Sequence, residues 1–390
     1  MKQILPKLKE VNKHLSFLKK SFTKRGFRHV IQYIDGLITL NKKTIRQISK
    51  ASIDGNHQSL LNRILTEAKF KQNALEERYI KKIKYITRGQ IISLLFDDTL
   101  VERNGENIEE TQLHKDHSSN GFIKGHQFFT SIIHTIFIQL PLFPKLYSKN
   151  TDSKIQMASD LIDFVIERMK INNVIMDSWY SDKKIINKCI TKGIRVVCGI
   201  KTNRNVSIER GNWQLLSDFS KEIPKKEFQN FFIDDIKYKI SSHIVKLKGI
   251  PCIKMLDSYE WNEKHEKYNN VFHLISTNKK DNVVGIIRMY RIRWFIETYH
   301  RDIKQNLGFA KVFLRKKEGI VRHAIFASIA YATLKLFMFF RDLSMTIGEC
   351  CAYIQDKEMD DFIREIIEVE DKETRVNLFE EVFIRKSAKV

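Results

Sequence analysis

The part of the sequence that limits the fold of this chain most narrowly lies between residues 90 and 200. There, apolar strand-like runs alternate with periodic helical segments. QIISLLFDDT is an apolar run that ends in two aspartates, and β-branched and aromatic runs follow it to about residue 140. A periodic helical segment, the run NNVIMD, a helix closing on Gly193 and the run IRVVCGIK come next. Strands followed by strand-helix-strand units pack as a mixed sheet with helices on its faces, so the sequence predicts an α/β fold.

The charge balance indicates a polyanionic partner. The chain of 390 residues carries 68 Lys and Arg against 46 Asp and Glu, a formal charge of +22. Such an excess suits binding to DNA, RNA or an anionic membrane. Five cysteines without a CxxC pair indicate neither a disulfide framework nor a zinc ribbon, and they fit a reducing cytoplasm. Two long apolar runs contain polar residues, so we expect buried elements and no membrane span.

Changes in composition divide the chain into five predicted segments. Basic helical stretches come first, and short alternating segments such as IKYKISSHIVKLKGI interrupt the α/β pattern after residue 200. The basic N-terminal helices are expected to contact DNA, with an ordinary basic helical bundle as the alternative. The predicted segments are a helical DNA-binding region (1–88), the first part of the core (89–200), a β-rich insertion (201–285), the second part of the core (286–345) and a C-terminal helical region (346–390).

Carboxylates at the ends of predicted strands suggest a metal site. Asp98 ends LLFDD and Asp177 ends NNVIMD, and α/β folds place ligands at the loops after their strands. A fold that brings both beside Glu297 creates three hard oxygen ligands of the kind that suits Mg²⁺ or Mn²⁺. Two such ions can activate a water or a 3′-hydroxyl in phosphoryl transfer, which fits a basic protein acting on DNA.

Other aspartates compete with these three carboxylates. Asp97 shares an Asp-Asp pair with Asp98, whose place at the predicted strand end favours it. Asp182 opens a predicted helix, where capping of the helix N-terminus is the expected role. Asp302 lies on a different side of its predicted helix from the neighbouring cationic residues, so Glu297 is preferred.

The segment YRIRWFIETYHRDIK (290–304) carries a polar stripe. On one continuous helix Tyr290, Arg293, Glu297 and Lys304 fall within an arc of roughly 60°. Apolar residues occupy the opposite side, as in a helix packed against a core. The stripe is therefore expected to face a cleft or solvent, and an amphipathic helix with a solvated face is the alternative interpretation.

These motifs resemble bacterial insertion-sequence transposases of the DDE type, whose last catalytic helix carries a Y-x2-R-x3-E-x6-K (YREK) signature. The four stripe residues fill its positions, and Trp294 follows the arginine as is common in that family. DDT at 97–99 is similar to its first acidic motif, and the segment beginning DSWYSDKK at 177 is similar to its second. The resemblance extends from about residue 40 to about residue 340.

The resemblance implies a ribonuclease-H-like core that the β-rich insertion interrupts. It also implies metal-dependent cleavage at the terminal inverted repeats of a mobile element, and joining of the freed 3′-hydroxyls to target DNA. By that resemblance Asp98, Asp177 and Glu297 bind two divalent cations, Mg²⁺ or Mn²⁺. The residues expected to contact DNA near the cut are Tyr290, Arg293, Trp294 and Lys304.

Further expectations concern DNA contacts and assembly. A basic run after the signature could extend the DNA-binding surface, with a solvated loop as the alternative; it comprises Lys311, Arg315, Lys316 and Lys317. We expect a cytoplasmic homodimer that synapses element ends and meets target DNA. The alternatives are a related nuclease that cuts without joining, and a catalytically inactive DNA-binding protein that inhibits transposition.

Overall fold

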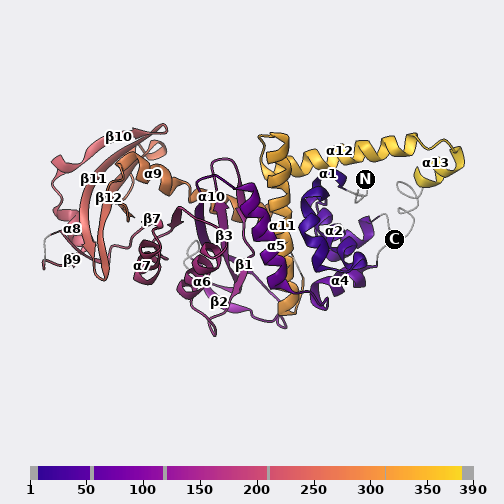
Figure 1. Ribbon diagram of the computed structural model, residues 1–390, viewed down its shortest axis with the longest axis horizontal. Helices are drawn as coiled ribbons and strands as arrows, with labels where there is room; N and C mark the ends of the chain where they lie inside the picture. The colour runs from indigo at the N-terminus through magenta and orange to yellow at the C-terminus, as the bar shows by residue number, and fades with distance from the viewer. Residues whose placement is uncertain (1–7, 53–56, 117–120, 209–210, 312, 380–390) are drawn as a thin grey trace.

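The computed structural model describes residues 8–52, 57–116, 121–208, 211–311 and 313–379, and it shows an elongated molecule (Figure 1). A β-rich part forms one end, the sheet core lies in the centre, and the N-terminal helices together with the two C-terminal helices form the other end. The strands are β1 (Ser93–Glu102), β2 (Gln112–Asp116), β3 (Gly121–His134), β4 (Gln139–Pro141), β5 (Lys145–Tyr147), β6 (Asn173–Met176), β7 (Arg195–Gly199), β8 (Asn205–Ser207), β9 (Gln214–Leu215), β10 (Gln229–Ile233), β11 (Ile236–Leu247), β12 (Ile250–Asn262), β13 (Lys267–Tyr268) and β14 (Phe272–Ser276).

Helices flank this sheet and build both ends of the chain. Three 3₁₀ segments, Lys13–Ser21, Lys225–Glu227 and Glu263–His265, accompany them. The α-helices are α1 (Lys9–Asn12), α2 (Lys24–Thr39), α3 (Ile45–Ala51), α4 (Gln58–Thr66), α5 (Gln72–Ile86), α6 (Lys154–Ile166), α7 (Lys183–Thr191), α8 (Leu216–Glu222), α9 (Val283–Arg291), α10 (Trp294–Gln305), α11 (Lys317–Arg341), α12 (Ile347–Ile367) and α13 (Lys372–Phe379).

The sheet is mixed, and the predicted α/β fold is confirmed. Its strand order is β2-β3-β1-β6-β7-β14-β12-β11-β8-β9. β1, β6 and β7 run parallel, and the helices α6 and α7 make the connections on either side of β6. β3 pairs antiparallel with β1, so an antiparallel hairpin extends one edge of the parallel core.

The β-rich insertion continues the core sheet. β14 pairs antiparallel with β7 and with β12, so the inserted strands β8 to β14 are joined edge to edge with the strands that carry the acidic motifs. Without β14, the backbone groups along one side of β7 would be unpaired. This pairing fixes the position of the insertion relative to the core.

A long apolar helix, α11, forms the core between the sheet and the N-terminal helices. It contacts α2, α4, α10 and β4, and 17 of its 25 residues are buried. The Tyr33 hydroxyl of α2 lies 2.7 Å from Nδ1 of His323 on α11. Among the described residues α11 alone is long and apolar enough to span a membrane, and 83% of its apolar window is buried within the protein. This burial fits a core helix.

Candidate active site

The pairing of β1 with β6 decides which aspartate of the Asp-Asp pair faces Asp177. The parallel pairing of β1 with β6 ends at Leu95 and Ile175. Continued by two residues, this register sets Asp97 level with Asp177, which directly follows β6, and the charge of Asp177 acts on the Asp97 carboxyl. Successive side chains of a strand point to opposite faces of the sheet. Asp97 and Asp177 therefore belong to one face, and Asp98 belongs to the other.

One arginine links Asp97 with the glutamate of the signature. Nη1 of Arg293 lies 3.4 Å from Oδ2 of Asp97, and Nη2 of the same side chain pairs with Oε1 of Glu297. The side chains of Asp97 and Glu297 keep 21% and 33% of their surface exposed. The two carboxylates thus lie on either side of one guanidinium, and both remain accessible to solvent.

The position of Asp97 makes its ionised form unfavourable. Burial, together with the charges of Asp177 and Asp98, raises the pKa of the Asp97 carboxyl to about 7, although Arg293 opposes this shift. In this environment a nearby cation would stabilise the ionised form of the carboxyl group. Its position and its chemistry therefore match those of a metal ligand.

The environment of Asp98 differs from that of Asp97. The sequence groups Asp98 with Asp177 and Glu297, whereas the structure places its carboxylate among other partners. Its carboxylate pairs with Nζ of Lys154 at 2.9 Å and accepts hydrogen bonds from the Tyr180 hydroxyl at 3.0 Å and from Gln127. The strand also does not end here, since β1 continues to Glu102. Asp98 therefore fixes the connection before α6 to the strand, on the face opposite Asp97.

The two other competing aspartates have local structural roles. Asp182 caps α7, because its side chain accepts the backbone N–H of Lys184 at 2.8 Å, which confirms the capping prediction. Asp302 is mostly buried on α10, and burial raises the pKa of its carboxyl. It lies near Lys335 of α11, away from Asp97.

The signature segment is broken into two helices, whereas the sequence pattern predicts one. α9 ends at Arg291 and α10 begins at Trp294. The turn between them is tightened by bonds between residues three apart, including Ile292 N–H to Met289 C=O at 3.2 Å. Tyr290 therefore ends one helix, Arg293 lies in the turn, and only the glutamate and lysine of the signature share a helix.

The other signature residues line the same region. Arg293 stands with Cζ 5.7 Å from the centre of the Tyr290 ring, and burial raises the pKa of Tyr290 to about 12. Lys304 donates to the carbonyl of Leu100 at 3.0 Å, and burial lowers its pKa. Trp294 keeps 60% of its surface exposed at the start of α10.

A buried hydrogen-bonded chain, which the sequence pattern did not single out, attaches α10 to β1. Thr130 lies opposite Asp97 in the pairing of β3 with β1, and its hydroxyl donates to the Asp97 carbonyl at 3.0 Å. The same hydroxyl lies 2.6 Å from Nε2 of His300, three residues after Glu297. Burial and two nearby cations lower the pKa of His300 to about 3, so this imidazole is neutral. Only the strand pairing could reveal this link.

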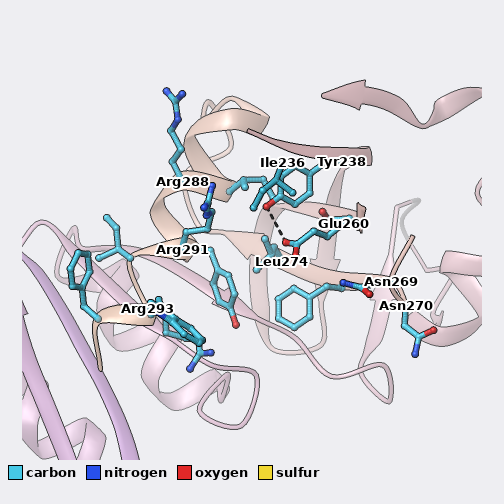
Figure 2. Close-up of a pocket in the computed structure, with 16 residues that line it drawn as sticks. Ile236, Tyr238, Glu260, Asn269, Asn270, Leu274, Arg288, Arg291 and Arg293 are labelled. Atoms are coloured by element: carbon cyan, nitrogen blue, oxygen red, sulfur yellow. Dashed lines mark hydrogen bonds between the residues drawn. The ribbon is translucent and has the colours of Figure 1, made fainter. Parts of the chain in front are cut away.

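A cleft of about 800 Å³ opens beside this group of residues, between the insertion and the turn that joins α9 to α10 (Figure 2). Arg288, Arg291 and Arg293 lie on one side of the residues that line it, and Asn269 and Asn270 lie on the opposite side. Arg288 and Arg291 both pair with Asp234, at 2.9 and 3.2 Å. The lining residues are Ile236, Tyr238, Ser258, Glu260, Asn269, Asn270, Phe272, Leu274, Ile287, Arg288, Tyr290, Arg291, Ile292, Arg293, Trp294 and Phe295.

The basic run after α10 lies in and just after the loop leading to α11. Lys311, Arg315 and Lys316 are exposed, while Lys317 begins α11 and pairs with Glu110 at 2.8 Å. The loop thus presents three cations to solvent, apart from the group of carboxylates.

The carboxylates are oxygen donors of the type that Mg²⁺ and Mn²⁺ bind. Within the part of the chain that the structure describes, no three His, Cys, Asp or Glu side chains gather closely enough to hold a metal ion as they stand. Arg293 separates Glu297 from Asp97. The donor set and the environment of Asp97 fit divalent cations, provided that the guanidinium moves aside.

One family model matches most of this chain. The family model "Transposase DDE domain" matches residues 88–333, more than half of the chain. The chain therefore belongs to the DDE transposase family, as the sequence motifs predicted, and its core has the ribonuclease-H-like fold of that class. No curated protein matches the chain. Among solved structures it is similar to a piggyBac transposase synaptic complex with hairpin DNA, with 10% identity, a TM-score of 0.47 and coverage of 96% of this chain and 81% of that one.

Proposed function

We propose that this transposase cuts DNA at the terminal inverted repeats of an insertion sequence and transfers the 3′-hydroxyl ends into target DNA. The observation that carries the proposal is the register that sets Asp97 level with Asp177, on the face where Arg293 joins Asp97 to Glu297. The net charge of +22 suits a DNA substrate.

Asp97, Asp177 and Glu297 are the proposed ligands of two divalent cations, Mg²⁺ or Mn²⁺. Asp97 replaces Asp98 in this assignment, because Asp98 is held by Lys154 on the other face of the sheet. When bound, such ions activate the attacking water or hydroxyl and stabilise the leaving oxygen. The chain's own part is to hold the three carboxylates on rigid elements, two at neighbouring strands and one on a helix.

Arg293, Tyr290, Lys304 and Trp294 are the proposed DNA contacts near the cut. Arg293 contacts two of the carboxylates and also lines the cleft, so its guanidinium can bind a phosphate beside the scissile bond with a charge-assisted hydrogen bond. The cleft, lined by Tyr290 and Trp294 among others, is the proposed site of the DNA strand that adjoins this phosphate. Such contacts position the backbone without distinguishing sequence.

The remaining parts are assigned supporting roles in the same proposal. The basic N-terminal helices (1–88) bind the inverted repeat, the core halves (89–200 and 286–345) carry the carboxylates, and the insertion (201–285) closes one side of the cleft. The C-terminal helices (346–390) complete the fold. The protein acts as a homodimer that pairs two element ends on DNA in the cytoplasm.

The test is a cleavage assay followed by a joining assay. Purified protein is incubated with Mg²⁺ or Mn²⁺ and DNA ending in the repeats that flank its own gene, with Glu297→Gln as the inactive control. We expect cuts at the repeat ends, and joined products when a pre-cleaved end and target DNA are supplied. Cuts without joining would indicate a nuclease, and repeat binding without cuts would indicate an inhibitor.

A further inference from the structure

An aromatic ring protrudes from the loop between α10 and α11. Phe313 keeps 87% of its surface exposed, more than any other large apolar side chain in the described part of the protein. Single exposed apolar residues are common, so exposure alone indicates no function. The neighbouring backbone and charges give this ring a particular setting.

The chain is hydrogen-bonded to the rest of the protein shortly before and shortly after the ring. Before the ring, Nη1 of Arg103 donates to the carbonyl of Ala310 at 2.8 Å. After it, the carbonyl of Arg315 accepts the backbone N–H of Glu109 at 2.9 Å. Leu314, the next residue, keeps only 6% of its surface exposed. The chain is thus attached to the rest of the protein at Ala310, Leu314 and Arg315, close to the exposed ring on both sides.

Cationic residues flank Phe313 in the sequence. Lys311, Arg315 and Lys316 are exposed, and none of them has an ion pair among the described residues. The nearby carboxylates have partners in the protein, since Glu110 pairs with Lys317 and Glu109 accepts the backbone N–H of Lys317 at 2.8 Å. Glu318, in the first turn of α11, is also exposed, so the exposed side chains between Lys311 and Glu318 carry a net positive charge.

We propose that Phe313 inserts into the base stack of bound duplex DNA, while Lys311, Arg315 and Lys316 hold the adjacent phosphates. Apolar wedges and stacked aromatic rings combined with Lys and Arg contacts are a recurrent way to grip DNA. A negatively charged partner accounts for three exposed cations without ion pairs in the same loop as an exposed ring. An apolar protein surface would not account for these cations.

The position of the ring predicts where the DNA is deformed. Glu297 and the end of α10 at Gln305 are separated by about 12 Å along the helix, and the loop continues from there. DNA rises 3.4 Å per base pair, so this length of helix alone corresponds to about three to four base pairs, and we expect the wedge to enter away from the base pair at the cut. The location relative to a cut rests on the proposed function, whereas insertion into DNA does not.

The experiment uses the full-length protein and a duplex of the terminal repeat with 2-aminopurine placed at successive positions. We expect fluorescence at one step to rise when the unmodified protein binds, because the base there is unstacked. Phe313→Ala should abolish this rise and weaken binding about tenfold, as expected when one stacked base contact is lost. Phe313→Trp should restore both, and Phe232→Ala, which removes an exposed ring on β10, should change neither.

A second readout separates the ring from the charges. The slope of affinity against salt concentration should be unchanged in Phe313→Ala and shallower in Lys316→Gln. Unchanged affinity and fluorescence in Phe313→Ala would overturn the wedge, and a change only in its self-association would assign the ring to a protein contact. If the unmodified protein bound the repeat with neither bases unstacked nor DNA cut, both this inference and the proposed function would fail.

Discussion

Replacing Asp97 with Asn should stabilise the protein in metal-free buffer, although it removes a proposed ligand. The pKa of this carboxyl is about 7 in the folded protein against 3.8 for an unperturbed Asp. Between these two values the folded state binds a proton that the unfolded state has lost, so stability falls as pH rises. Above pH 7 the ionised carboxylate destabilises the fold by up to about 4 kcal/mol, at 1.36 kcal/mol per pKa unit.

Asn cannot ionise, and the pKa of about 7 already includes the contact of Asp97 with Arg293; the altered hydrogen bonding of an amide at this position offsets part of the gain. We therefore expect Asp97→Asn to be more stable than the unmodified protein by about 1 to 3 kcal/mol at pH 8, and by little near pH 4. Urea unfolding in EDTA at several pH values measures the difference. Equal or lower stability at pH 8 would refute the conclusion that Asp97 is held in an unfavourable electrostatic environment.

Three further predictions address residues around the site and the packing of α2 against α11. Asp98→Asn should lower stability by about 1 to 3 kcal/mol, because it breaks the pair with Lys154 in a mostly buried setting, and unchanged urea unfolding would contradict this. Tyr33→Phe should cost about 1 kcal/mol, because a buried hydrogen bond to His323 is lost, and calorimetry measures it. His300 on α10 is linked through Thr130 to the Asp97 carbonyl, so we expect His300→Ala to loosen the placement of Glu297 relative to Asp97. The substitution should therefore lower Mn²⁺ affinity in equilibrium dialysis more than DNA affinity, while an equal loss of both would indicate general damage.

Strand and helix patterns predicted the mixed α/β fold, because those patterns follow from local burial. The choice between Asp97 and Asp98 could not be made in the same way. It depends on how β1 is aligned with β6, about 80 residues away in the chain, and a shift of one residue exchanges the two faces. Placing Asp98 at the end of its strand was also wrong, because pairing with β3 extends β1 to Glu102.

The break in the signature segment had no local signal either. The two residues at the break are Ile292 and Arg293, and neither is a helix-breaking Gly or Pro. Helix propensity alone therefore predicts a continuous helix. The pairing of β14 with β7 likewise joins segments about 75 residues apart, which a pattern along the chain does not encode. The motifs thus indicated candidate residues for the site, while the way in which the structure groups those residues depends on the register of the sheet.

The most direct test of the account compares Asp97→Asn with Asp98→Asn in Mn²⁺-dependent cutting of the terminal repeat. Both substitutions remove one charge at adjacent positions, and circular dichroism and repeat binding establish that each variant is folded. The account predicts that Asp97→Asn binds the repeat but does not cut it, whereas Asp98→Asn cuts it at a temperature where it is folded. Cutting by Asp97→Asn together with an inactive, folded Asp98→Asn would contradict the proposed site.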